Sequence, residues 1–307
     1  MTDADVPSSA SETCPSSGKD DIAVRPRFAE CCDPSELLDL SGRTGLVIKL
    51  NDARSLAWPA AMHLRRAGAE LAITYVNERT RSHVEPVARQ LEAPIVLPCD
   101  IAVPDQLKAV NAAISQRWRR LDFRLRAIGS VPPADLHGRL TDSLAEGFAK
   151  AVTVSVHSLI RMARLAKPLM TKGGSILTLS YLGAERVVAN YNVMEPVKAA
   201  SEGSVRYLTH ELGPGGIRVN AISAGPVQTR AASGLTNFGS HLSASARVAP
   251  LRRNFSGDEV GRAALLLVGD YASAVTGEVL HVDAGGHVDG PIRQIKTRKQ
   301  DKMGRRE

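Results

Sequence analysis

The sequence predicts an α/β fold in which helices cover both faces of a parallel sheet, and three observations support that prediction. Apolar runs of roughly four to eight residues recur along the chain, separated by segments long enough for helices. The first two runs flank one helical segment, which is the pattern of a βαβ unit. With 307 residues, 43% of them hydrophobic, the chain is large enough for one α/β core. We therefore expect a single domain with a doubly wound, parallel, seven-stranded sheet of the Rossmann type.

The first βαβ unit begins at Gly45, where the composition of the chain changes. The run Gly-Leu-Val-Ile from this residue is typical of a buried parallel strand. A helix from about Ser55 to Ala67 follows, and Gly68 stops it. The next residues, Glu70–Tyr75, supply the second strand.

Five further strands complete the predicted sheet. Segments of helical length separate them, so each connection can cross over one face of the sheet. Ligand groups in such a fold lie outside the carboxyl ends of the strands. The remaining strands are predicted at Ile95–Asp100, Phe123–Ile128, Ser175–Ser180, Ile217–Ile222 and Val279–Asp283.

Both ends of the chain differ from its middle. Residues 1–40 are rich in Ser, Asp and Pro and carry nine acidic side chains against three basic ones, so we expect a disordered, mobile N-terminal arm. Residues 291–307 carry seven basic side chains against two acidic ones and show no apolar face, which predicts a basic, solvated C-terminal tail. The predicted domain therefore covers residues 41–290.

Several classes of protein are disfavoured. No apolar run approaches the roughly 18 residues that span a bilayer, and the first residues lack the order of a secretory signal. Neither the four cysteines nor the eight histidines show a disulfide or metal-binding pattern. We expect a soluble, cytoplasmic protein without a metal site and with no membrane partner.

The net charge of +7 allows anionic partners. Nucleic acid is disfavoured because aromatic residues make up only 4% of the chain and no basic stripe is interleaved with them. An anionic cofactor accounts for the charge equally well. Nucleic-acid binding stays open only as a hypothesis that would require a steep fall of affinity with salt.

Tyr191 and Lys198 form the most informative pair. Seven residues are nearly two helical turns, so the two side chains share a helix face about 10 Å apart along its axis. A lysine there can hold the ribose hydroxyls of a cofactor, and a phenol can donate to an oxygen that gains negative charge. This is the chemistry of hydride transfer to a conjugated carbonyl.

At this point the chain resembles the short-chain dehydrogenase/reductase superfamily and, within it, the enoyl-acyl carrier protein reductases. Their pattern is Tyr-x6-Lys with a second tyrosine ten residues earlier, which here are Tyr191, Lys198 and Tyr181. The resemblance covers about residues 41–288. It is carried by blocks in the family's order: Ser180–Val188, Tyr191–Met194, Gly216–Pro226, Ala231–Gly234, Pro250–Arg253 and Thr276–Asp283.

The resemblance implies roles for the residues of this motif. Tyr191 would donate its phenolic hydrogen bond to the thioester oxygen while hydride reaches the β-carbon, and Lys198 would bind the nicotinamide ribose. Tyr181 would line the acyl pocket and help in protonation or in positioning the substrate. Val131 and Met194 would complete the substrate-binding residues.

The cofactor implied by the resemblance is NADH. No basic residue occupies Val76 or Asn77, where a 2′-phosphate would be gripped, although Arg79 and Arg81 leave NADPH as the alternative. The substrate would be an acyl thioester on acyl carrier protein or coenzyme A, and the assembly a homotetramer. The implied cofactor-binding residues are Lys49, Ser55, Leu56, Asp100, Ile101, Ile128, Gly129, Lys198, Val227, Thr229 and Ala231.

Departures from the family pattern cluster near the expected cofactor diphosphate. Lys49 and Pro59 stand where relatives have glycines that allow close approach of backbone to phosphate and of helix to strand. Lys49 could place a point charge on phosphate or block the site, and Glu195 could repel the diphosphate or pair with Lys198. The sequence thus predicts an enoyl-thioester reductase of fatty acid biosynthesis, with a catalytically impaired binding or assembly protein as the alternative.

Overall fold

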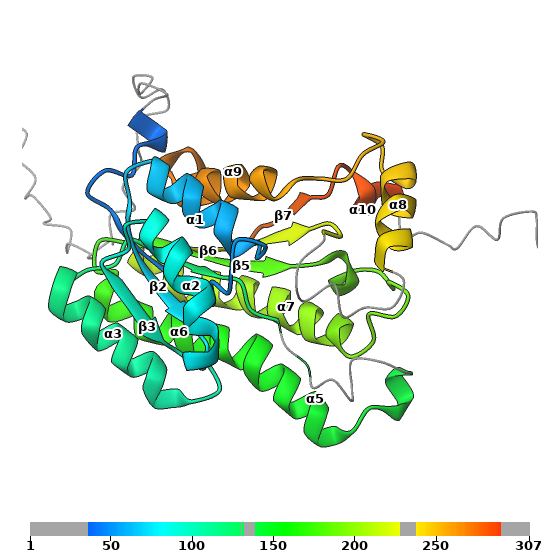
Figure 1. Ribbon diagram of the computed structural model, residues 1–307, viewed down its shortest axis with the longest axis horizontal. Coiled ribbons are helices and arrows are strands. Elements are labelled where there is room, and N and C mark those ends of the chain that lie inside the picture. Colours follow the sequence, from blue (N-terminus) through cyan, green and yellow to red (C-terminus); the bar gives the residue numbers. More distant parts are fainter. Residues whose placement is uncertain (1–35, 130, 132–138, 228–237, 290–307) are drawn as a thin grey trace, which may run out of the picture. The chain divides into compact units, whose positions relative to one another are not determined.

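The computed structural model describes residues 36–129, 131, 139–227 and 238–289, which all belong to one compact unit, Pro34–Glu307. Within these residues, seven parallel strands form a single sheet in the order β3-β2-β1-β4-β5-β6-β7 (Figure 1). The strand order reverses between β1 and β4, which makes this the switch point of a doubly wound sheet. The predicted Rossmann-type fold is confirmed.

The strands agree with the predicted runs to within two residues at either end. Strands three and four end two residues earlier than predicted, because hydrogen-bonded pairing stops at Pro98 and Arg126. The sixth strand is two residues longer than predicted. The bounds are β1 Thr44–Ile48, β2 Glu70–Tyr75, β3 Ile95–Pro98, β4 Phe123–Arg126, β5 Gly174–Ser180, β6 Ile217–Ala224 and β7 Val279–Val282.

Helices lie on both faces of the sheet. The helices α1 Ala57–Arg66, α2 Glu78–Gln90 and α9 Gly257–Val268 pack on one face, and α3 Pro104–Trp118, α6 Ser158–Ala166 and α7 Met194–Leu212 on the other. A π-helix, Thr153–His157, joins α5 (Ala145–Val152) to α6. The structure also contains α8 Phe238–Val248, α10 Gly286–Asp289 and short 3₁₀ turns at Glu36–Leu38, Leu140–Asp142, Lys167–Leu169, Leu182–Ala184, Gly213–Gly215 and Asp270–Ala272.

The core consists of two apolar layers, one on each face of the sheet. In β1, Val47 faces the layer under α1 and α9, whereas Leu46 and Ile48 face the layer under α3 and α6. This alternation follows from the two-residue period of a strand. Burial on both faces explains why the strands read as continuous apolar runs rather than alternating ones.

The folded unit begins earlier than the predicted boundary at residue 41. Glu36–Leu38 forms a 3₁₀ turn, and the side chain of Leu40 is fully buried in the core. The last residues of the predicted arm therefore belong to the domain. The other residues of the arm and the predicted tail lie outside the described residues.

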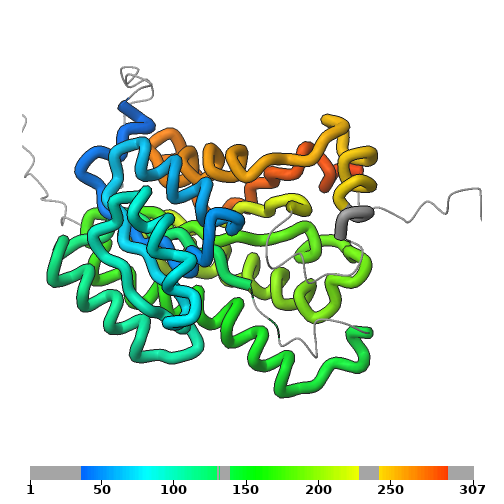
Figure 2. Tube along the Cα trace, viewed as in Figure 1, coloured from blue at the N-terminus to red at the C-terminus, as the bar shows by residue number. Residues whose placement is uncertain are grey.

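Helix α1 begins two residues later than predicted, and this makes room for Pro59. Pro59 is the third residue of α1, where a backbone N–H has no acceptor within the helix, so its missing donor costs little. The side chain of Pro59 lies against Gly257 of α9, and its backbone carbonyl lies against Gly261. Figure 2 shows that α1 and α9, blue and orange, run side by side although about two hundred residues separate them.

Candidate active site

Tyr181 and Tyr191 lie together beyond the carboxyl end of β5. Tyr181 directly follows this strand, and Tyr191 lies in the turn before α7. Their ring centroids are 4.7 Å apart at an interplanar angle of 59°. Gly183 makes this packing possible, because a Cβ there would come within 2.6 Å of the Tyr191 ring.

Lys198 is buried on the second turn of α7, and its ammonium is fixed in place. Its Nζ donates to the backbone carbonyl of Leu179 at 2.8 Å. Burial and, after it, the positive charge of Arg126 lower the pKa of Lys198 to about 8, while Glu202 acts in the opposite sense. Within the described part of the chain, Lys198 forms no ion pair with Glu195, whose carboxylate instead accepts from the backbone amide of Val188.

Both phenols are held in their neutral, donating form. Burial and, after it, the Glu195 carboxylate raise the pKa of Tyr181 to about 12. Burial, the neighbouring Tyr181 and Glu195 together raise the pKa of Tyr191 as well. At neutral pH both side chains are therefore hydrogen-bond donors rather than phenolates.

A small apolar cluster adjoins Tyr191. Met194 at the start of α7 packs with Val193 and Val197, and the partly buried Val131 and Tyr191 lie against them. The structure thus brings together the residues that the sequence suggested for the substrate. They form an apolar wall beside two phenolic donors.

The turn between β1 and α1 carries two buried polar atoms that no described group satisfies. These are Asn51 Oδ1 and Ser55 Oγ, and both lie at the N-terminal end of α1. Backbone amides and the positive end of a helix dipole favour a negative ligand at such a position. Of the two atoms, only the Ser55 hydroxyl can donate to an anion, because the Asn51 amide oxygen is an acceptor; Ser55 and the start of α1 therefore fit a phosphate group.

Lys49 follows β1 and adopts a backbone conformation that favours glycine, with φ +65°. Its backbone amide donates to Thr74 Oγ1 at 3.1 Å, which ties the turn to β2. The side chain is half-buried, and burial followed by the charge of Arg126 lowers the pKa of its ammonium, while Asp100 opposes this. Lys49 therefore brings a cation to the carboxyl end of β1.

Asp100 and Ile101 follow β3 at the same edge of the sheet. The Asp100 carboxylate accepts from the backbone amide of Ala102 at 2.9 Å, which orients it in the loop. Ile101 is buried, and its carbonyl accepts from Arg161 at 3.2 Å. Both residues thus lie in a fixed loop beside the end of β2.

Ile128 and Gly129 lie beyond β4. The Ile128 side chain is buried in the core, so only its backbone can face a ligand. A Cβ at Gly129 would lie 3.8 Å from Lys198 Nζ and 3.3 Å from Met194, so the glycine keeps this approach open.

Val227 follows β6 and is partly buried, whereas Thr229 and Ala231 lie outside the described residues.

Sequence reasoning missed Arg126 and Glu202, two buried charged residues beside Lys198. Arg126 lies in the otherwise apolar run Phe-Arg-Leu-Arg of β4, and a charge in a strand expected to be buried on both faces was the available signal. Glu202 lies four residues after Lys198 and accepts from the Ser180 hydroxyl. Burial raises the pKa of Glu202.

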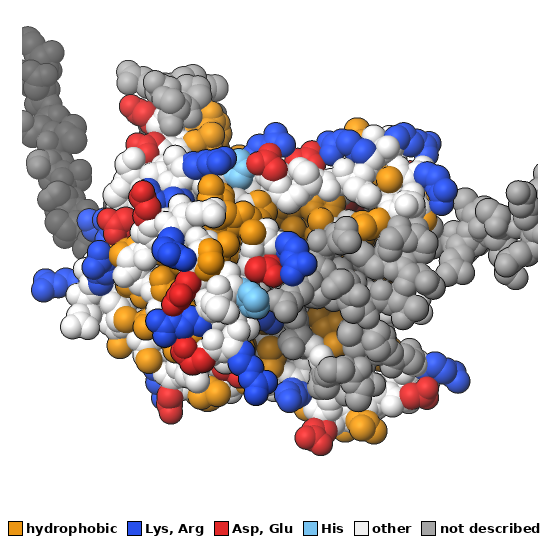
Figure 3. Space-filling view, in the orientation of Figure 1, with side chains coloured by type: hydrophobic (Ala, Val, Ile, Leu, Met, Phe, Trp, Pro, Cys, Tyr) orange, Lys and Arg blue, Asp and Glu red, His pale blue; other side chains and the backbone are white. Residues whose placement is uncertain are grey.

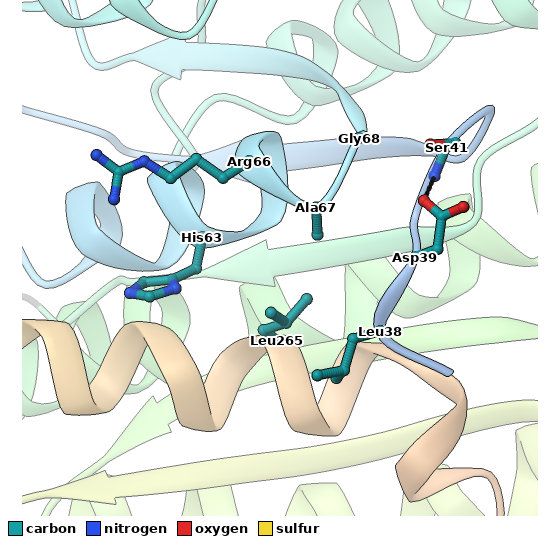
Figure 4. A pocket seen from close by; sticks show the side chains of 8 residues that line it. All are labelled: Leu38, Asp39, Ser41, His63, Arg66, Ala67, Gly68 and Leu265. Carbon is teal, nitrogen blue, oxygen red and sulfur yellow. Dashed lines mark hydrogen bonds between the residues drawn. The ribbon is translucent and has the colours of Figure 1, made fainter. Parts of the chain in front are cut away.

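A hollow of about 430 Å³ lies at the C-terminal end of α1, away from the candidate active site (Figure 4). It is far along the helix from Ser55, because it is formed at the C-terminal end of α1 and against α9. None of the predicted site residues lines it. Its lining residues are Leu38, Asp39, Ser41, His63, Arg66, Ala67, Gly68 and Leu265.

Charged side chains of both signs are interspersed on the face of the molecule shown in Figure 3. Ion pairs such as Arg81 with Glu85 on α2 and Arg262 with Asp258 on α9 join charges of opposite sign. Among its described residues this face shows no continuous basic stripe, and it gives the nucleic-acid hypothesis no support.

The family model described as Enoyl-(Acyl carrier protein) reductase matches residues 51–287. The enoyl-[acyl-carrier-protein] reductase [NADH] 1 of Rhizobium meliloti is 44% identical over 251 residues, which are 82% of this chain and 92% of the relative. The corresponding NADH reductase of Bacillus cereus is 45% identical over 253 residues, which are 82% of this chain and 99% of that relative.

Solved structures give the same result. The enoyl-(acyl-carrier-protein) reductase of Anaplasma phagocytophilum in complex with NAD matches with a TM-score of 0.79 and 43% identity, over 81% of this chain and 95% of that chain. The Bacillus cereus enoyl-acyl carrier protein reductase with NADP⁺ and an indole naphthyridinone matches with a TM-score of 0.79 and 45% identity, over 81% of this chain and 98% of that chain.

Proposed function

We propose, because the chain belongs to the enoyl-acyl carrier protein reductase family, that it reduces 2-enoyl thioesters with NADH in fatty acid biosynthesis. The acyl carrier would be acyl carrier protein, as in the names of these relatives. The observations that support the proposal are the packing of Tyr181 on Tyr191 beyond the end of β5 and the bond of Lys198 to Leu179 of the same strand. The two phenols are neutral donors, and an apolar wall lies beside them.

In the proposed mechanism, Tyr191 donates to the thioester oxygen and stabilises the enolate that forms there. NADH, when bound, supplies the hydride that reaches the β-carbon. Tyr181 packs on Tyr191 and fixes its orientation toward the acyl chain. Lys198, held by the Leu179 carbonyl, donates to the nicotinamide ribose and keeps the local field positive.

The remaining contacts of the cofactor are assigned to the ends of the strands. Ser55 and Leu56 would bind the diphosphate at the start of α1, and Lys49 would add a positive charge. Asp100 and Ile101 would bracket the adenine, while the backbone at Ile128 and Gly129 would pass beside the nicotinamide. Val227, Thr229 and Ala231 are proposed to complete the diphosphate and carboxamide contacts.

The departures from the family pattern that suggested an impaired protein do not disrupt this arrangement of site residues. Pro59 falls in the first turn of α1 and packs on the glycines of α9. Glu195 is bound by a backbone amide, so Lys198 is left for the ribose. The relatives, too, are named as reductases rather than as binding proteins.

The test is a titration of the purified full chain with NADH and with NADPH, followed by an assay of NADH oxidation with a 2-enoyl-acyl carrier protein and with crotonyl-coenzyme A. We expect micromolar NADH binding, weaker NADPH binding and turnover that depends on the thioester. A folded protein that binds neither cofactor at millimolar concentration would contradict the proposal.

We also propose that the protein is a cytoplasmic homotetramer. Helix α7 exposes Ala199, Ala200 and Tyr207, and a Cβ at Gly203 would meet only one side-chain atom within 4 Å, so packing within the chain does not require this glycine. Small residues let two helices approach closely. Among the described residues, no helix is long and apolar enough to span a membrane. Light scattering after gel filtration measures the mass of the assembly.

A further inference from the structure

Strand β4 buries two guanidinium groups that the proposed mechanism does not use. Arg124 and Arg126 alternate with Phe123 and Leu125, so both side chains point to the face covered by α3 and α6. Their exposed fractions are 0% and 1%. No carboxylate in the described part of the chain lies within ion-pair distance of either. Buried charges without a counter-ion are costly and call for an explanation.

Arg124 has only structural partners. It donates to the backbone carbonyls of Met162 and Leu165 on α6 and to the side-chain oxygen of Asn111 on α3. These bonds join β4 to the two helices that cover it. Among the described residues, Arg124 forms no hydrogen bond or ion pair with a residue of the candidate active site.

Arg126 has partners of a different kind. It donates to Thr178 Oγ1 on β5 at 3.1 Å, to the carbonyls of Val154 and Ser155 at 3.0 and 2.6 Å, and to Ser158 Oγ at 2.9 Å. The two carbonyls belong to the π-helix, a rare element that frequently occurs at functional sites. Arg126 therefore fixes the π-helix against β4 and β5.

The same contacts place Arg126 beside Lys198. Arg126 holds Thr178, and Lys198 donates to the next residue of β5, Leu179. Gly129, three residues after Arg126, approaches Lys198 Nζ from the end of β4. Helix α7, which carries Lys198, packs on the π-helix that Arg126 fixes.

We infer that Arg126 is a positioning residue for Lys198, fixing the wall behind its ammonium and placing a like charge beside it. This inference rests on the proposed role of Lys198 in binding the cofactor ribose. Two cations near one another raise the cost of keeping Lys198 protonated, and the pKa of Lys198 is accordingly lowered, by burial first and by Arg126 second. Burial also lowers the pKa of Arg126, which remains protonated at neutral pH because guanidinium is so basic.

The other charged and titratable groups near Lys198 do not replace this effect. Glu202 lies on the same helix and acts in the opposite sense, and β5 offers only carbonyl and hydroxyl groups. On the π-helix, His157 is exposed to solvent. Tyr181, Tyr191 and Glu195 lie at the same end of the strands, and Lys49 follows β1. Of these groups, Arg126 and Glu202 are the ones whose charge bears on the pKa of Lys198.

The test compares Arg126→Gln with the matched variant Arg124→Gln. Both remove one buried guanidinium from the same strand and the same face, and glutamine keeps an amide donor for the carbonyls. The pH at which Lys198 is half-titrated is measured from its ¹³Cε chemical shift in the full chain without cofactor, with Lys198→Arg as the assignment control. We expect the midpoint to rise by roughly one pH unit in Arg126→Gln and to stay unchanged in Arg124→Gln.

A second set of measurements uses NADH. Protonated Lys198 is the donor to the ribose, so NADH affinity should fall as pH rises through the Lys198 midpoint, and this fall should move to higher pH in Arg126→Gln. Arg126→Lys restores the like charge and should return the midpoint toward that of the wild type. If Arg126→Gln does not fold, Arg126→Met gives the same comparison against Arg124→Met.

An unchanged Lys198 midpoint in the neutral Arg126 variants, or an equal shift in the Arg124 variants, would overturn the inference. Failure of the proposed function has a different signature. In that case the wild-type protein would bind no NADH, while the chemical-shift titration of Lys198 would still respond to Arg126.

Discussion

Two regions of the candidate site, the segment from β5 to α7 and the turn from β1 to α1, differ in how they depart from the family pattern. The segment from β5 to α7 has Tyr181, Tyr191 and Lys198 at the family spacing, with Glu195 as its departure, and the Tyr191 ring packs against both Tyr181 and Gly183. The turn from β1 to α1 has lost both family glycines, and Lys49 now occupies a left-handed conformation there. In the first region, contacts between rings hold the residues in place, whereas in the second a lysine adopts a backbone conformation that favours glycine.

The comparison indicates which property each region must supply. Hydrogen bonding to a reacting oxygen depends on the position of one phenol, so neighbours that fix the ring cannot vary freely. Binding a diphosphate depends on positive potential, which backbone amides, a helix N-terminus or a lysine can all provide. A lost glycine at the turn can therefore be offset by charge, while a lost tyrosine cannot.

The largest expected effect comes from breaking the preserved region. Tyr191→Phe should lower kcat for a 2-enoyl thioester by on the order of 10²–10³-fold, because it removes the donor to the developing enolate oxygen. NADH affinity should stay unchanged, and steady-state kinetics with a parallel NADH titration measures both. Tyr181→Phe is the matched control, and we expect a smaller loss. Equal turnover in Tyr191→Phe and wild type would refute the assignment.

A second prediction concerns the glycine that accommodates Pro59. A Cβ at Gly261 would lie 2.7 Å from the Pro59 carbonyl oxygen and 2.4 Å from the His63 ring, so Gly261→Ala must push α1 from α9. The free energy of unfolding should fall by about 1–3 kcal/mol, as for other overpacked sites. Denaturant unfolding measures it.

Gly213→Ala is the control for Gly261→Ala, because a Cβ at Gly213 meets no atom within 4 Å. Its free energy of unfolding should not fall. A Gly261→Ala variant as stable as the Gly213→Ala variant would show that α1 and α9 adjust without cost.

The third prediction separates charge from close approach at the turn. Lys49→Met keeps the left-handed backbone and removes the ammonium, so NADH should bind roughly tenfold more weakly, and its affinity should depend less on salt. Isothermal titration at two salt concentrations measures both. Tighter NADH binding by Lys49→Met would instead mean that the Lys49 side chain obstructs the diphosphate.

The smallest expected effect tests the charge inside the first region, between β5 and α7. Glu195→Gln removes the negative charge that, after burial, raises the pKa of Tyr181. The pKa of Tyr181 should fall, so that its phenolate appears at lower pH than in the wild type, by less than about one pH unit. Ultraviolet titration of the tyrosines, with Tyr181→Phe as the assignment control, measures the shift. A rise in this pKa would contradict the role given to Glu195.

Much of the fold could be predicted from the sequence because it depends on local patterns. Apolar runs such as Glu70–Tyr75 reveal buried strands, and Gly68 marks the end of α1. Such features depend on neighbours in the chain, so they can be read without knowing the remainder of the structure. The spacing of Tyr191 and Lys198 predicted one shared helix face, but Tyr191 lies in the turn before α7 and only Lys198 lies on the helix.

The sequence by itself therefore determined the Rossmann-type sheet and its strands, and it predicted a site of Tyr181, Tyr191 and Lys198. Only the tertiary structure decided that Pro59 is accommodated by α9, that Glu195 is bound by Val188 rather than Lys198, and that Arg126 lies buried beside Lys198. Each of these outcomes depends on which groups replace water around a side chain. Desolvation and hydrogen bonding are set by residues from other elements, and no spacing along the chain encodes them.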